Sequence, residues 1–131
     1  MLNKEQHIDF WVKQAEDDWG AVEALFNTGK CVQSLFWAHL TVEKYAKAVW
    51  IKYNKENVPP KTHNIALLIS KTPLQVPLEM TEVMLIANKF SLEGRYPEYI
   101  HDMEAISNKT FAEEQIQQIQ FLKTWLSKNL Q

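Results

Sequence analysis

The chain has 131 residues, a formal net charge of −2 and a single cysteine, Cys31. This length predicts one domain, residues 1–131, whose core needs no disulfide or structural metal. The lone cysteine excludes an internal disulfide and favours a reducing compartment, the cytoplasm. The weak negative charge gives no overall attraction to a polyanion, so contact with nucleic acid must be local or supplied by a partner. No apolar stretch approaches the ~20 residues of a membrane span, so we expect no membrane contact.

Two long amphipathic helices are predicted in the first half of the chain. Apolar residues recur every three or four positions from about residue 3 to residue 27, where the helix ends near Gly29, and again from about 31 to 54. On the polar side of the second helix, Glu43 precedes Lys47 by one turn. This spacing predicts a solvated ion pair worth only ~0.3–0.5 kcal/mol, and not a site.

Shorter helices are expected in the second half. Residues 52–61 combine lysines with two prolines and predict a loop, after which Thr62 can cap a short helix. Further helices are expected over 78–92, from Pro97 onward, and over 111–130. Short connections favour antiparallel neighbours. The predicted fold class is therefore all-α, an up-and-down bundle of four main helices with one or two short extra helices.

The segment from Gly94 to His101 is the most informative for function. Arg95 is the only arginine in a chain with thirteen lysines, which suggests a need for a planar, bidentate cation. If Pro97 opens a helix, Arg95 lies just before its N-terminus and His101 about one turn inside, an arrangement suited to phosphate. The alternative is that Arg95 pairs with a nearby carboxylate such as Glu98 and that His101 is structural.

Three histidines are candidate ligands or catalysts. His63 lies in the first turn of the short helix and is expected to bond the backbone at a loop corner, and His39, on the apolar face of its helix, is expected to be a satisfied core residue. A metal triad of these two with His101 has no supporting spacing, and a di-iron bundle needs two Glu-x-x-His elements where this chain has one. We expect neither a metal nor an organic cofactor.

The order of five features along the chain carries a family resemblance. They are AEDD at 15–18, a turn at Gly29, SLFWAH at 34–39 leading to VEKYAKA at 42–48, PKTHNI at 60–65, and GRYP at 94–97. Together they resemble the small prokaryotic HEPN proteins, over nearly the whole chain. No single motif is diagnostic, and the match lies in their order and spacing.

This resemblance implies a helical bundle that forms a homodimer with its functional cleft at the dimer interface. Members are often encoded beside a minimal nucleotidyltransferase, and many such pairs behave as toxin and antitoxin. Active members resemble metal-independent ribonucleases with an arginine, four to six residues, and a histidine; Arg95 and His101 have five between them. His101 would then assist attack of the RNA 2′-hydroxyl on its phosphate, and Arg95 would stabilise the phosphoryl oxygens.

A non-catalytic alternative remains open, because Tyr96 and Pro97 follow the arginine where the ribonuclease pattern commonly has a polar residue. In it the chain is a nucleotide-binding or interaction module that partners a nucleotidyltransferase. The candidate residues for binding nucleotide or RNA phosphate are Arg95, Tyr96, Tyr99, His63 and Lys61.

Because the chain is rich in aromatic residues, Trp37, Trp50 or Trp125 are candidate anchors of the homodimer.

Overall fold

The computed structural model describes residues 1–131, with six α-helices and no strands. The helices are α1 (Lys4–Asn27), α2 (Cys31–Tyr53), α3 (Ile65–Ser70), α4 (Leu78–Asn88), α5 (Pro97–Ile106) and α6 (Lys109–Lys128). The all-α prediction is confirmed. None of these helices combines the length and the apolar character needed to cross a membrane.

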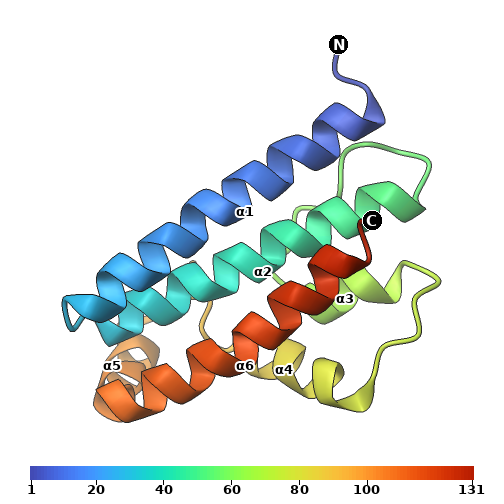
Figure 1. Ribbon diagram of the computed structural model, residues 1–131. Helices are drawn as coiled ribbons and strands as arrows, with labels where there is room; N and C mark the ends of the chain where they lie inside the picture. The colour runs from blue at the N-terminus through green and yellow to red at the C-terminus, as the bar shows by residue number, and fades with distance from the viewer.

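The helices α1 and α2 form a long antiparallel hairpin that supports the rest of the molecule (Figure 1). The turn between them contains Gly29 at φ +80°, a left-handed conformation that glycine adopts without steric cost. Helix α6 packs along α2, and α3 and α4 cover the neighbouring side of α2 (Figure 1). The short α5 contacts α2 at the end nearest the hairpin turn (Figure 1). The connection between α4 and α5 thus crosses the surface of the bundle.

Asparagine side chains cap the N-termini of three of the six helices. Asn3 forms a capping box with Gln6 at the start of α1, and Asn108 accepts a hydrogen bond from the backbone of Phe111 at the start of α6. The predicted cap at Thr62 is wrong, because α3 begins at Ile65, with Asn64 as its cap. Thr62 instead accepts a hydrogen bond from the Asn64 backbone, which shapes the turn ahead of the helix.

The boundaries of two other helices also differ from the sequence pattern. Helix α4 ends at Asn88, whereas the apolar periodicity predicted a helix to residue 92. Phe90 and Ser91 are nevertheless buried, because the chain leaves the helix while it still lies against the core. Helix α6 begins at Lys109, ahead of the predicted start at residue 111, since Asn108 supplies the cap. Residues 89–92, which the pattern assigned to α4, instead belong to the loop that carries the candidate site.

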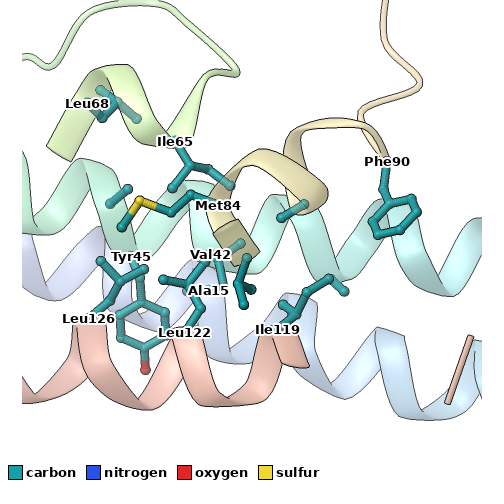
Figure 2. Close-up of a cluster of buried hydrophobic side chains, with 14 of the residues drawn as sticks. Ala15, Val42, Tyr45, Ile65, Leu68, Met84, Phe90, Ile119, Leu122 and Leu126 are labelled. Carbon is teal, nitrogen blue, oxygen red and sulfur yellow. The ribbon is translucent and has the colours of Figure 1, made fainter. Parts of the chain in front are cut away.

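The core lies where α2 faces its neighbours (Figure 2). Ala15 of α1 and Val42 of α2 are fully buried, and Leu122 and Leu126 of α6 close the same layer. Burying aliphatic side chains of this size contributes about 1.5–3 kcal/mol each. Trp50 is only 8% exposed and belongs to this core, so the prediction that it is free to anchor a dimer is wrong. Trp37 and Trp125 are half-buried against the core.

Candidate functional site

Arg95 lies in the connection between α4 and α5 and is held on two sides. Its Nε donates a hydrogen bond of 3.1 Å to the Ser91 carbonyl, and its guanidinium carbon lies 4.4 Å from the centre of the Tyr99 ring. The Tyr99 hydroxyl in turn donates to the Lys89 carbonyl, which fixes the ring. Gly94, at φ +75°, makes the turn that brings Arg95 back over this surface. The guanidinium is therefore oriented while its terminal nitrogens stay available.

The sequence left open a pairing of Arg95 with a nearby carboxylate, and the structure contains no such ion pair. Glu98 is solvent-exposed and forms none of the observed salt bridges, and Asp102 lies 3.8 Å from His101 instead. An exposed arginine with a fixed plane and free terminal nitrogens is suited to bidentate recognition of an oxyanion.

Two hollows meet at Arg95. The first, of about 340 Å³, has no hydrophobic residue in its lining, which consists of Thr62, His63, Asn64, Asn88, Ser91, Glu93 and Arg95. The second, of about 590 Å³, is largely apolar and is lined by Ile86, Lys89, Phe90, Arg95, Tyr99, Met103, Ile106, Phe111 and Gln115. Small-molecule sites commonly have volumes in the range of about 300–1,000 Å³. Arg95 therefore lines both the polar hollow and the apolar hollow.

A buried carboxylate positions the histidine of the polar hollow. Oε1 of Glu43 lies 2.8 Å from Nδ1 of His63, and Oε2 lies 3.1 Å from Nζ of Lys47. The Glu43 side chain is only 4% exposed, so the predicted solvated pair with Lys47 is wrong. Glu43 is buried because the loop that carries His63 folds across α2 and covers it. On the other side of the ring, Nε2 of His63 lies 3.2 Å from Oε2 of Glu93.

His39 supports this arrangement from the core position that was predicted for it, but it is only half satisfied, because its Nδ1 is buried without a hydrogen-bond partner. Its Nε2 donates a hydrogen bond of 3.0 Å to the His63 carbonyl, and the side chain is fully buried. Burial lowers the pKa of His39 below its ordinary value of 6.5, and this effect exceeds the opposing effects of the His63 carbonyl and Glu43. His39 therefore holds the loop as a neutral side chain.

The fold is shared with two solved structures. TT1696 from Thermus thermophilus superimposes with a TM-score of 0.78 at 19% identity, covering 94% of this chain and 98% of that one. ST0689, described as an archaeal HEPN homologue, gives a TM-score of 0.69 at 16% identity, covering 95% and 98%. The pattern of the HEPN domain family matches residues 8–130. The chain belongs to the HEPN domain family. No curated protein sequence gives a significant match.

His101 lies on α5, its side chain is 83% exposed, and its nearest charged neighbour is Asp102 at 3.8 Å. It lines neither of the hollows that contain Arg95. No three His, Cys, Asp or Glu side chains converge as ligands of one metal ion.

Of the other predicted residues of this HEPN protein, two lie in the hollows and two lie outside them. His63 and Tyr99 face the polar and the apolar hollow respectively. Tyr96 is 80% exposed, and Lys61 is exposed beside the lining residue Thr62. Neither Tyr96 nor Lys61 forms part of either lining.

Sequence reasoning missed Glu43 and Glu93 as members of the site. For Glu43 a signal was present, because it follows His39 by four residues and therefore shares the helix face that was expected to be buried. A carboxylate on a buried face needs a partner. For Glu93 there was no such signal, since the sequence pattern placed the end of α4 close to it.

Proposed function

We propose that this HEPN protein binds a phosphate group, of a nucleotide or of RNA, in the polar hollow beside Arg95. The observation that carries the proposal is the state of the Arg95 side chain, which is held by the Ser91 carbonyl and the Tyr99 ring but has no carboxylate partner. A planar guanidinium donates to two phosphate oxygens at once. Its orientation before binding reduces the conformational entropy that binding would cost.

The surroundings of Arg95 support a nucleotide as the source of the phosphate. His63 lines the same polar hollow, and its Nε2, which is paired there with Glu93, becomes a second nitrogen donor where Glu93 moves aside. The adjoining apolar hollow has the Tyr99 and Phe111 side chains in its lining, and aromatic rings stack on nucleobases with a gain of about 1–3 kcal/mol per base. A phosphate in the first hollow and a base in the second would share Arg95 between them.

The catalytic form of this proposal is metal-independent cleavage of RNA. In it His101 takes the proton of the 2′-hydroxyl as that oxygen attacks the phosphorus, and Arg95 stabilises the charge on the phosphoryl oxygens. The bond from phosphorus to the 5′-oxygen breaks, and the leaving oxygen takes up the proton from His101. The support is the five-residue spacing together with family membership. Because His101 is 83% exposed in the single chain, this form also requires a second copy of the chain to enclose it. It therefore includes a homodimer whose cleft contains α5, acting as the toxin of a toxin–antitoxin pair.

The second candidate is a non-catalytic binding or interaction module. The position of His101, outside both hollows, favours it. In this form Arg95 and Tyr99 hold the ligand, and the chemistry belongs to a minimal nucleotidyltransferase partner in the cytoplasm. Exposed apolar side chains near the site, Tyr96 at 80% and Ile106 at 54%, supply contact area for a partner or a second copy.

Binding is tested by titrating the protein with adenosine monophosphate and with a mixed RNA pool. Arg95→Ala is expected to weaken both affinities by about tenfold or more, the cost of a charge-assisted hydrogen bond. Lys13→Ala is the matched control, because this cation is 75% exposed and lies on α1. Equal losses in the two variants would mean that Arg95 contributes only its charge, and would contradict the proposal.

Catalysis is tested by incubating the same RNA pool with the protein in EDTA. Cleavage that Arg95→Ala and His101→Ala both abolish supports the ribonuclease form. Absence of cleavage, with binding that depends on Arg95 alone, supports the module. Light scattering at micromolar concentration tests the homodimer, and a monomer there would remove the enclosure that His101 requires.

A further inference from the structure

Glu93 occupies the solvent-facing nitrogen of His63. Its Oε2 lies 3.2 Å from Nε2 of His63, inside the hollow that Arg95 also lines. The opposite ring nitrogen is bonded to Glu43, whose side chain is 4% exposed, whereas that of Glu93 is 66% exposed. One carboxylate is therefore fixed in the core and the other can leave toward solvent. An exposed ion pair of this kind contributes little to stability, so its separation costs little.

The charges around the hollow define what could replace Glu93. Both ring nitrogens of His63 face carboxylate oxygens and donate to them, so this ring counts as a cation together with Lys47 and Arg95. The carboxylates that face these cations are Glu43 and Glu93. When Glu93 swings away, three cations remain beside the single carboxylate of Glu43, an excess of two positive charges. A group with two negative charges would match that excess, and a group with one would only restore what Glu93 already supplies.

We propose that Glu93 is an internal occupant of the anion site and that a phosphate monoester replaces it at His63. The proposal rests on the proposed function and narrows it from phosphate in general to a terminal phosphate. A monoester carries about −1.5 to −2 charges at pH 7 and has three free oxygens. An internal phosphodiester has one charge, two free oxygens and two substituents that must fit beside the lining. A free mononucleotide and the phosphorylated end of an RNA present the same chemistry.

Glu43 is a positioning residue in this exchange. Lys47 holds its second oxygen at 3.1 Å, so Glu43 cannot follow Glu93 out of the site. The His63 ring consequently keeps its orientation, with Nε2 facing the hollow, whether Glu93 or the ligand is bound. Glu93 itself precedes Gly94, and its side chain can rotate away without moving any helix.

The test compares wild type, Glu93→Gln and Glu98→Gln by calorimetric titration with three ligands. These are adenosine monophosphate, a dinucleoside monophosphate without a terminal phosphate, and a 5′-phosphorylated oligoribonucleotide. Glutamine at position 93 keeps the size of the side chain and removes its charge. Glu98 is an exposed carboxylate on the neighbouring α5 that lines neither hollow, so its variant controls for the change in net charge.

We expect Glu93→Gln to bind adenosine monophosphate about fivefold more tightly than wild type, which corresponds to the loss of a competing pair worth about 1 kcal/mol. Glu98→Gln is expected to match wild type. The diester should bind more weakly than the monoester to all three proteins. Similar affinities for the mononucleotide and the phosphorylated oligonucleotide would mean that the site recognises the terminal phosphate alone. A large difference would show whether the site prefers a free mononucleotide or the phosphorylated end of an RNA.

Three results would overturn the inference in distinguishable ways. Unchanged or weaker monoester binding by Glu93→Gln, in proteins whose binding still depends on Arg95, would remove the role of Glu93 and leave the phosphate site standing. Equal affinity of wild type for the diester and the monoester would show that the site does not prefer a terminal phosphate, and would also leave the phosphate site standing. Absence of binding by all three proteins to all three ligands would overturn this inference and the proposed function together.

Discussion

Oε1 of Glu43 and Nδ1 of His63 lie 2.8 Å apart, although the two residues are separated by twenty positions along the chain. This contact joins the middle of α2 to the loop ahead of α3. Through this contact Glu43, which lies on a buried helix face, holds His63 in position at the polar hollow. The stability of the core and the geometry of the hollow are therefore coupled.

Replacing Glu43 by glutamine should destabilise the fold. The change leaves Lys47, whose side chain is 13% exposed, without its carboxylate, and breaking a nearly buried pair from one side costs about 3–5 kcal/mol. Urea denaturation measures the loss. Asp17→Asn is the matched control, because its pair with Lys13 is exposed on α1 and should cost less than about 0.5 kcal/mol. Similar losses in the two variants would contradict the burial of Glu43.

The stability should fall with acid because of His39. Burial lowers the pKa of this side chain in the folded state, so between its unfolded value of 6.5 and its folded value the unfolded chain binds more protons. The neutral form stabilises the fold fully above pH 6.5, and that contribution is lost as the pH falls through the folded pKa.

His39→Gln tests this dependence, since its amide still donates a hydrogen bond to the His63 carbonyl but does not titrate. We expect wild type to lose more stability than this variant between about pH 7.5 and 5.5, measured as the free energy of unfolding. His101→Gln, at an 83% exposed position, should retain the pH dependence of wild type. If His39→Gln and wild type lose the same amount, His39 is not the titrating group.

Gly94→Ala should destabilise the loop before α5. Gly94 has φ +75°, and no atom lies within 4 Å of an added Cβ, so the cost is purely conformational, about 1–2 kcal/mol. Gly20→Ala, in the interior of α1 with equally open space, should stabilise the protein by about 0.5–1 kcal/mol. Thermal unfolding of the two variants should show Tm shifts of opposite sign, although both variants replace glycine by alanine. A gain at position 94 would contradict the left-handed turn.

Tyr99 should matter to ligand binding through its ring. The guanidinium carbon of Arg95 lies 4.4 Å from the ring centre, a cation–π contact worth about 0.5–1 kcal/mol at an exposed site. Tyr99→Leu should therefore weaken the binding of adenosine monophosphate by about threefold, and Tyr99→Phe, which keeps the ring, should stay closer to wild type. Equal effects of the two variants would assign the contribution to the hydroxyl and its bond to Lys89.

The boundaries of the helices show how far local signals reach. Periodicity and the turn glycine Gly29 placed α1 and α2 within a residue or two, because their apolar faces extend over many turns. The end of α4 was placed at residue 92 instead of Asn88, since Phe90 and Ser91 are buried in a loop and Phe90 carries the same apolar signal as a helix. Periodicity reports which residues are buried, and it does not report the backbone conformation that buries them.

The sequence by itself determined the all-α class and the HEPN family and singled out Arg95 as a candidate, because helix periodicity, motif order and residue type are properties of the chain. Only the tertiary structure decided which groups surround that arginine. It brought His63 and Glu93 into one hollow with Arg95, buried Glu43 beneath them and left His101 in solvent. These placements depend on how two loops fold across α2 and α4, and loop paths are set by packing between segments distant in sequence.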